Sequence, residues 1–127
     1  MAYSIDELFE MLSWDSTPQM QMIGLAEARK VKYLSVLFQP IESKSVWENC
    51  AKVIIEKSDL ELERYLIDMF QWLQDMNWPG ARLIYDRLRE MPRNLLQFAY
   101  SFCLEQAIST RDDCWRETLE EFWNNNY

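Results

Sequence analysis

The sequence predicts an all-α protein built from antiparallel helix pairs. Only two glycines occur among 127 residues, and no stretch sustains the apolar–polar alternation that is typical of a β-strand. Apolar residues instead recur at spacings of three and four, which places them on one face of each helix. A chain of this length with 49% hydrophobic residues can bury one core, so we expect a single domain over residues 1–127.

Two capped helices are predicted first. Ser4 and Glu7 have the spacing of a capping box, in which the side chain of each residue bonds the other's backbone N–H. We expect the first helix to end near Leu12. Thr17 is placed to cap a second helix whose first residue is Pro18, where the missing N–H costs nothing. In the first helix one stripe holds Ile5, Leu8, Phe9 and Leu12. The second helix should place Met22, Leu25 and Ala26 inward and end near Lys30.

We expect a short helix, a loop and a longer helix in residues 31–57. Pro40 should stop the short helix at about Phe38, because the residue before a proline disfavours helical geometry. The longer helix should start at Ser43 or Ser45 and end near Lys57. Its expected inward residues are Trp47, Cys50, Ala51 and Ile54.

The next helix starts with a second capping box, Ser58 with Glu61. Its expected apolar face is Leu62, Tyr65, Leu66, Met69, Phe70 and Leu73, and its expected solvated stripe is Glu61, Arg64, Asp68, Gln71 and Asp75. A following helix should open at Pro79. It should place Ala81, Ile84, Tyr85 and Leu88 inward and pair Arg82 with Asp86 on its outer row.

The helix expected over 94–110 is apolar around most of its circumference, because its polar residues form one narrow line, Gln97, Ser101, Glu105 and Ser109. Such a helix is usually central to a fold. The alternative is that one flank stays exposed as a docking surface. Pro92 separates this helix from the preceding one, and a last helix should start near Asp112 with Trp115, Leu119 and Phe122 inward.

The corner "WLQDMNWPG" (residues 72–80) holds the candidate site. Asp75 and Asn77 are suited to accept backbone N–H bonds at the start of the helix opened by Pro79. Trp72 and Trp78 can close over the corner like a hydrophobic staple, and Gly80 can let the second helix approach its partner. The candidate partner-binding or corner residues are Trp72, Asp75, Asn77, Trp78 and Arg82.

This corner also carries a family resemblance. The segment "LQDMNWPGARLIYDRL" resembles a HEAT corner, with an Asp at the turn and an Arg early in the second helix. The runs "VWENCAKVI", "LIDMFQWLQDMNWPGARLIYDRL" and "RDDCWRETLEEF" look like a small bacterial all-α family catalogued only as a domain of unknown function. The resemblance implies helix pairs stacked as a short HEAT-like α–α superhelix of about six to seven helices. It implies no catalytic residues.

The net negative charge of the chain indicates which classes of partner to expect. The formal charge is −8, and residues 1–28 hold five acids and no base, while 105–127 hold six acids and two arginines. Nucleic-acid binding depends on phosphate neutralisation by Lys and Arg, so we expect no nucleic-acid partner. The small cluster "RKVK" at 29–32 does not offset the acids. An acidic surface suits solubility alone or a basic protein partner.

Catalysis and metal binding are not indicated. The chain has no histidine, and its three cysteines, Cys50, Cys103 and Cys114, form no CxxC. The carboxylate pairs Asp112–Asp113 and Glu120–Glu121 are adjacent on a helix and therefore point about 100° apart. We expect Asp112 and Asp113 to cap a helix start and complement its dipole. No cofactor motif is present.

The preferred hypothesis is a non-catalytic protein-binding module that contacts a basic partner, in its most specific form an acidic immunity protein that neutralises a bacterial toxin. Its support is six Trp, six Tyr and six Phe, more than a small core must hold, although any single tryptophan can equally belong to the core or a corner. The alternatives are a regulatory or scaffold subunit and a carboxylate-dependent enzyme. The acidic N-terminus has no basic leader, and no apolar run is long enough for a membrane span, so we expect a cytoplasmic protein without a membrane partner.

Overall fold

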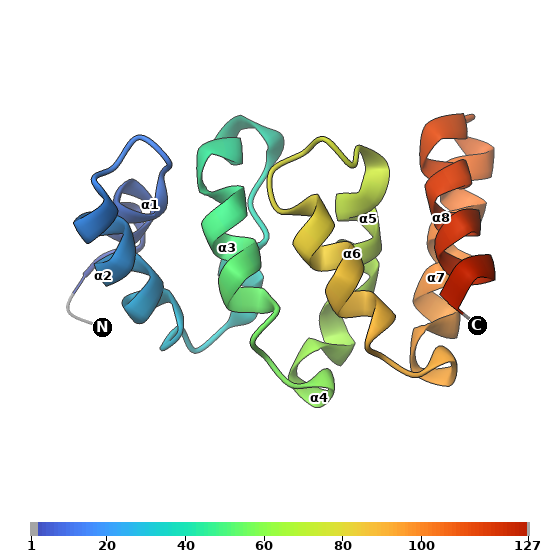
Figure 1. Cartoon of the computed structure of the whole chain (residues 1–127), viewed down its shortest axis with the longest axis horizontal. Coiled ribbons are helices and arrows are strands. Elements are labelled where there is room, and N and C mark those ends of the chain that lie inside the picture. The colour runs from blue at the N-terminus through green and yellow to red at the C-terminus, as the bar shows by residue number, and fades with distance from the viewer. Residues whose placement is uncertain (1–2, 127) are drawn as a thin grey trace. The chain divides into compact units, whose positions relative to one another are not determined.

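The computed structural model describes residues 3–126, and every regular element among them is a helix (Figure 1). There are eight α-helical segments, or seven if the single turn α4 is counted with α5, to which η3 joins it. The predicted all-α class and helix number are confirmed. The elements are α1 Ile5–Leu12, α2 Pro18–Ala28, η1 Leu34–Leu37, η2 Ile41–Val46, α3 Trp47–Ile54, α4 Asp59–Leu62, η3 Glu63–Tyr65, α5 Leu66–Gln71, η4 Trp72–Gln74, α6 Ala81–Arg89, α7 Arg93–Ser109 and α8 Asp113–Asn126, where η marks a 3-10 helix.

The chain divides into two compact units, residues 1–56 and 57–127. Each unit has its own helices and is described by itself. A single folding domain over 1–127 and a HEAT-like stacking of helix pairs both stay predictions.

The first unit begins with the helical hairpin α1–α2. The capping box of Ser4 and Glu7 is confirmed, with both backbone-to-side-chain bonds at 3.1 Å. Thr17 caps α2 through the backbone N–H of Met20, and Pro18 is the first helical residue. The two helices approach closely at Gly24, where an added Cβ would lie 3.0 Å from the Cβ of Met11. A larger residue at Gly24 would therefore push α1 and α2 apart.

The inward face predicted for α2 is wrong at two positions. Met22 and Ala26 are exposed, whereas Gly24 and Ala28 are buried and Leu25 is half-buried. The reason is that apolar residues occur all round this helix, so their spacing does not define one face. Close helix–helix contact at the small residues decides which side is buried.

The segment between α2 and α3 differs from the prediction in two places. The short helix expected up to Phe38 is the 3-10 turn η1, and the expected loop contains η2, so α3 starts at Trp47 and ends at Ile54. The α3 residues predicted to face inward are buried, and so is Asn49. The Asn49 side-chain amide donates to the Leu12 carbonyl (2.7 Å) and to Oε1 of Gln21 (3.0 Å). A single buried amide therefore connects α3 to both helices of the hairpin.

The second unit opens with the predicted capping box of Ser58 and Glu61, which is confirmed. The continuous helix expected after it is wrong, because η3 and η4 interrupt it and Tyr65 leaves helical geometry (φ −114°, ψ 11°). Most of the expected apolar face is still buried, with Tyr65 half-buried. Arg87 of α6 anchors the start of α4 by donating to the Lys57 carbonyl (2.8 Å) and the Asp59 carboxylate (2.7 Å).

Within this unit α5, α6, α7 and α8 run alternately up and down (Figure 1). Their common core centres on Phe70, whose ring meets Phe122 edge-on at 5.5 Å and Tyr100 at 6.1 Å between ring centroids. The Trp115 indole N–H donates to the Phe70 carbonyl at 3.0 Å. The inward positions predicted in α6 and α8 are buried, except that Tyr85 is half-buried.

The end of α7 has an unusual residue directly after its C-cap, Thr110. Arg111 has φ 57°, and it is the one residue other than glycine with positive φ among residues 3–126. Its N–H bonds the Ile108 carbonyl (3.1 Å), and the Asp112 N–H bonds the Ala107 carbonyl (2.8 Å). These two bonds form a Schellman motif, in which glycine usually occupies the left-handed position because it has no Cβ. Arg111 therefore holds a strained backbone conformation.

Replacing Arg111 by glycine should stabilise the protein by about 1 kcal/mol, because glycine adopts positive φ without the Cβ penalty. The free energy of unfolding from urea denaturation measures this. Arg111→Ala keeps the Cβ and should bring no such gain. Ser109→Gly, in the exposed last turn of α7, should instead cost about 0.5–1 kcal/mol. A destabilised Arg111→Gly protein would contradict the assignment of strain.

Candidate functional site

The corner between α5 and α6 is closed by Trp72. Its ring is buried, and its indole N–H donates to the Pro79 carbonyl at 2.9 Å. Trp78 is half-buried, and its backbone N–H and carbonyl both take part in turn bonds, to the Asp75 carbonyl and from the Ala81 N–H. Trp72 therefore closes the corner as predicted, through a hydrogen bond that the staple interpretation did not include.

The predicted capping of α6 is wrong. Asp75 Oδ1 accepts the backbone N–H of Asn77 at 2.8 Å, so it forms an Asx turn inside the corner. The helix begins at Ala81 and not at Pro79. The reason is Gly80, whose φ of 80° is incompatible with a helical path from Pro79 onward. Gly80 thus permits the turn, while the close approach expected of it occurs at Gly24 in the other unit.

Arg82 lies on the outer surface of α6. Its guanidinium pairs with Asp86 at 3.2 Å, which confirms the predicted i,i+4 pair, and lies over the Tyr85 ring at 4.9 Å from the centroid. Of the five candidate residues, Trp72 is held inside the corner, and Asp75, Asn77 and Arg82 are exposed. Their role in partner binding stays a prediction.

Three of the four candidate carboxylates, Asp112, Asp113 and Glu120, make structural contacts. Asp112 accepts the Trp115 N–H at the start of α8 (3.1 Å), as the capping interpretation predicted. Arg116 pairs with Asp113 at 3.7 Å and with Glu120 at 2.6 Å. Over the part of the chain that the structure describes, no three Cys, Asp or Glu side chains gather as metal ligands. These acids cap a helix and pair along it.

An open hollow of about 600 Å³ lies beside the corner. Gln74 of η4 lines it together with Gln106, Arg111, Asp112 and Cys114 from the junction of α7 and α8. Gln106 also bonds the Gln71 side chain at 3.2 Å, which ties α7 to α5 at the edge of the hollow. Asp112 and Asp113 both line the hollow, but their bonds to Trp115 and Arg116 already hold them in place.

Several exposed apolar side chains of the second unit lie together on α7. Phe98 is 76% exposed and Phe102 45%, and their rings stack with centroids 6.5 Å apart. Ile108 is also exposed on this helix, whereas Leu96, Ala99 and Cys103 are buried. We call Phe98, Phe102 and Ile108 the α7 flank. The expectation that α7 is buried around most of its circumference is wrong, and the exposure of one flank is confirmed, while its use as a docking surface stays a prediction.

The sequence contained a pattern that indicates the exposed face of α7. Phe98 lies two turns before Glu105 and about three turns before Ser109 on the same helix face, so the polar residues and the phenylalanines share one side. Phe102 follows Phe98 at i,i+4. The polar line therefore marked the exposed face, and the phenylalanines next to it belonged to that face.

A comparison with protein families identifies the larger part of the chain. A family model described as a domain of unknown function, DUF5071, matches residues 46–127. The chain belongs to this family. No curated protein and no solved structure matches the chain.

The DUF5071 match contains both features described above, the corner and the α7 flank, and its first matched helix is α3. The hairpin α1–α2 lies outside the matched residues. The resemblance to a family catalogued as a domain of unknown function is therefore confirmed, while a bacterial origin stays a prediction. Among residues 3–126, every helix is too short or too polar to cross a bilayer.

In this DUF5071 protein, Asp75→Ala should lower the free energy of unfolding by about 0.5–1 kcal/mol, because the Asn77 N–H loses its side-chain acceptor. Asp75→Asn keeps an acceptor oxygen and should cost less. Urea denaturation measures both. An Asp75→Ala protein of full stability that has lost a partner would show that Asp75 belongs to a binding surface.

The three cysteines should differ in reactivity. Burial raises the pKa of the Cys50 and Cys103 thiols to about 12, and the Asp68 charge adds to the effect at Cys103. A raised pKa keeps both thiols protonated between pH 7 and 9, so an aromatic disulfide reagent should modify only the exposed Cys114 in the folded protein. Denaturant should release the other two. The Cys114→Ser protein should be unreactive while folded, and fast labelling of that variant would contradict the buried positions.

Proposed function

We propose that the chain is a non-catalytic protein-binding module and that the α7 flank is its contact surface for a basic protein. The observation that supports this most directly is the stacked pair Phe98 and Phe102 on the outside of α7. Aromatic side chains dominate interface energetics when a partner buries them. Their exposure has a cost in water that a partner would remove.

The chemistry around the α7 flank suits a protein partner. Residues i, i+3, i+4 and i+7 of a helix present one stripe, and Phe98, Ser101, Phe102 and Glu105 follow this spacing. All four are exposed. An aromatic centre bordered by a hydroxyl and a carboxylate resembles the apolar core and polar rim of protein interfaces.

The charge of the chain supports a basic partner. The formal charge is −8, and Glu105 lies on the stripe of the α7 flank itself. Acidic surfaces speed the encounter with cationic proteins and exclude acidic ones. The most specific form of this proposal is an acidic immunity protein of a bacterium, located in the cytoplasm, that neutralises a cationic toxin. A regulatory or scaffold subunit would use the same surface in another pathway.

The stacking of helix pairs fits the same proposal. We propose a HEAT-like arrangement, supported by the alternating directions of α5 to α8 within the second unit. Stacked helix pairs present extended surfaces to other proteins. A carboxylate-dependent enzyme is less supported, because Asp112, Asp113 and Glu120 already serve helix ends and the pairs with Arg116.

The test is partner capture with paired variants. Phe98→Ser with Phe102→Ser should reduce capture of a basic protein from the native bacterium by at least tenfold, while the free energy of unfolding changes by less than about 1 kcal/mol, because both rings are exposed. Mass spectrometry of the captured proteins measures the first quantity and urea denaturation the second.

A matched control is Leu60→Ser, which removes an apolar side chain that is 80% exposed elsewhere in the same unit. It should leave capture unchanged. The assignment to α7 would be refuted if both variants lost partner capture equally. It would also be refuted if the double phenylalanine variant captured the partner as well as the unchanged protein does. The captured protein's own activity distinguishes the specific forms, because a toxin whose activity the chain blocks supports the immunity role and a metabolic or regulatory protein refutes it.

A further inference from the structure

The first unit has a second apolar surface, on α2. Met20 is 40% exposed, Met22 70% and Ile23 41%. Successive helical residues turn by 100°, so Met22 and Ile23 flank the outward side of α2, and Met20 lies one turn before Ile23. The opposite side of the helix, with Gly24 and Ala28, is buried. The outward side of α2 therefore presents Met22, Ala26 and Ile23, with the exposed polar side chain of Gln19 between them.

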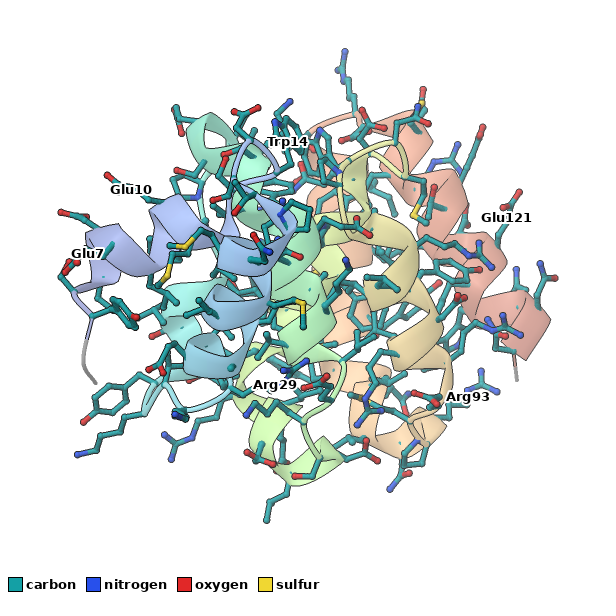
Figure 2. The ribbon with its side chains drawn as sticks, turned by 60° about the vertical axis from the view of Figure 1, so that its left-hand side comes forward. Glu7, Glu10, Trp14, Arg29, Arg93 and Glu121 are labelled. Atoms are coloured by element: carbon teal, nitrogen blue, oxygen red, sulfur yellow. The ribbon has the colours of Figure 1, made fainter. Side chains whose placement is uncertain are left out.

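The neighbouring helix of the same hairpin carries exposed acidic side chains. Asp6, Glu7 and Glu10 of α1 are exposed, and Asp15 is exposed in the turn that leads to α2. Figure 2 shows Glu7 and Glu10 projecting outward from α1. Residues 3–28 contain no Lys or Arg, and the fifth acid, Glu27, pairs with Lys30 at 3.3 Å. The hairpin thus combines exposed methionines with charge of one sign.

We propose that this surface, Met20, Met22 and Ile23 with Glu7 and Glu10, binds a basic amphipathic helix of a partner protein. Methionine suits such a role because its flexible thioether adapts to the apolar face of a helix. An amphipathic helix presents apolar residues at i, i+3, i+4 and i+7, with cations on its borders. Those cations would meet the carboxylates of α1.

Other occupants fit the charge less well. A second copy of this chain would bring its own Glu7 and Glu10 against the same acids, and like charges oppose such a contact. Anionic lipid and nucleic acid are repelled for the same reason. A basic helix is the occupant that both the methionines and the acids favour.

The inference deepens the proposed function, because it assigns a further contact for a basic partner, but it rests on different residues. The hairpin α1–α2 precedes residue 46, where the family match begins, and the α7 flank lies in the other unit. The two surfaces can therefore be tested separately. A hairpin outside the shared family segment is suited to select the partner of this particular chain.

The experiment measures binding of the full chain to a fluorescein-labelled peptide of 18 residues, made of Leu and Lys with Leu at helical spacing, by fluorescence anisotropy. We expect micromolar affinity at low salt. Met22→Gln with Ile23→Gln, and separately Glu7→Gln with Glu10→Gln, should each weaken binding at least tenfold. The control Ile41→Gln alters another exposed apolar residue of the same unit and should leave affinity unchanged.

Peptide controls separate this site from general charge attraction. A peptide with the same Leu and Lys in scrambled order, without an apolar stripe, should bind at least tenfold more weakly. Equal binding of the scrambled peptide, no binding at all, or binding that ignores Met22 and Ile23 would overturn the inference. If Phe98→Ser with Phe102→Ser abolishes peptide binding while the α2 variant does not, the inference fails and the proposed role of the α7 flank is supported.

Discussion

The structure depends on indole hydrogen bonds to backbone carbonyls in and beside its short, interrupted helices. A backbone carbonyl that is buried without a donor is costly. Three tryptophans donate to backbone carbonyls, at Phe70 within α5 and at Pro40 and Pro79, which precede η2 and α6; the Pro40 carbonyl also accepts the Ser43 N–H (2.9 Å). The indole N–H of Trp47 bonds the Pro40 carbonyl (3.2 Å), that of Trp72 the Pro79 carbonyl (2.9 Å) and that of Trp115 the Phe70 carbonyl (3.0 Å). Each ring also fills buried space.

Most of the tryptophans have structural roles, so the high aromatic content alone does not indicate a binding surface. Trp47, Trp72 and Trp115 are structural, and Trp123 stacks on Tyr100 with ring centroids 4.2 Å apart. The exposed apolar side chains on α7 are Phe98, Phe102 and Ile108, and those on α2 are Met20, Met22 and Ile23, while Trp14 and Tyr33 are exposed elsewhere. The indole N–H of each of three buried tryptophans thus serves a backbone carbonyl.

Sequence reasoning succeeded where the signal was local. The capping boxes at Ser4 and Ser58 need only residues three positions apart, and all the required atoms lie within one turn. It failed where a distant contact decided the outcome, as in α2, whose buried side is selected by Met11 and Leu12 of α1 at Gly24. At the corner, Pro79 is a favourable first residue of a helix, so the sequence predicts that the helix starts there. The positive φ of Gly80 moves the start to Ala81. The Asn49 bonds had no local signal.

Asn49 has a consequence for how the protein can be divided. It lies within residues 46–127, yet both groups that accept its amide protons, the Leu12 carbonyl and Gln21, lie before residue 46. A fragment cut at the family boundary would therefore lose both acceptors and uncover the side of α3 that carries this amide. The stretch of sequence shared by the family is consequently smaller than the piece of chain that must be expressed to keep α3 intact.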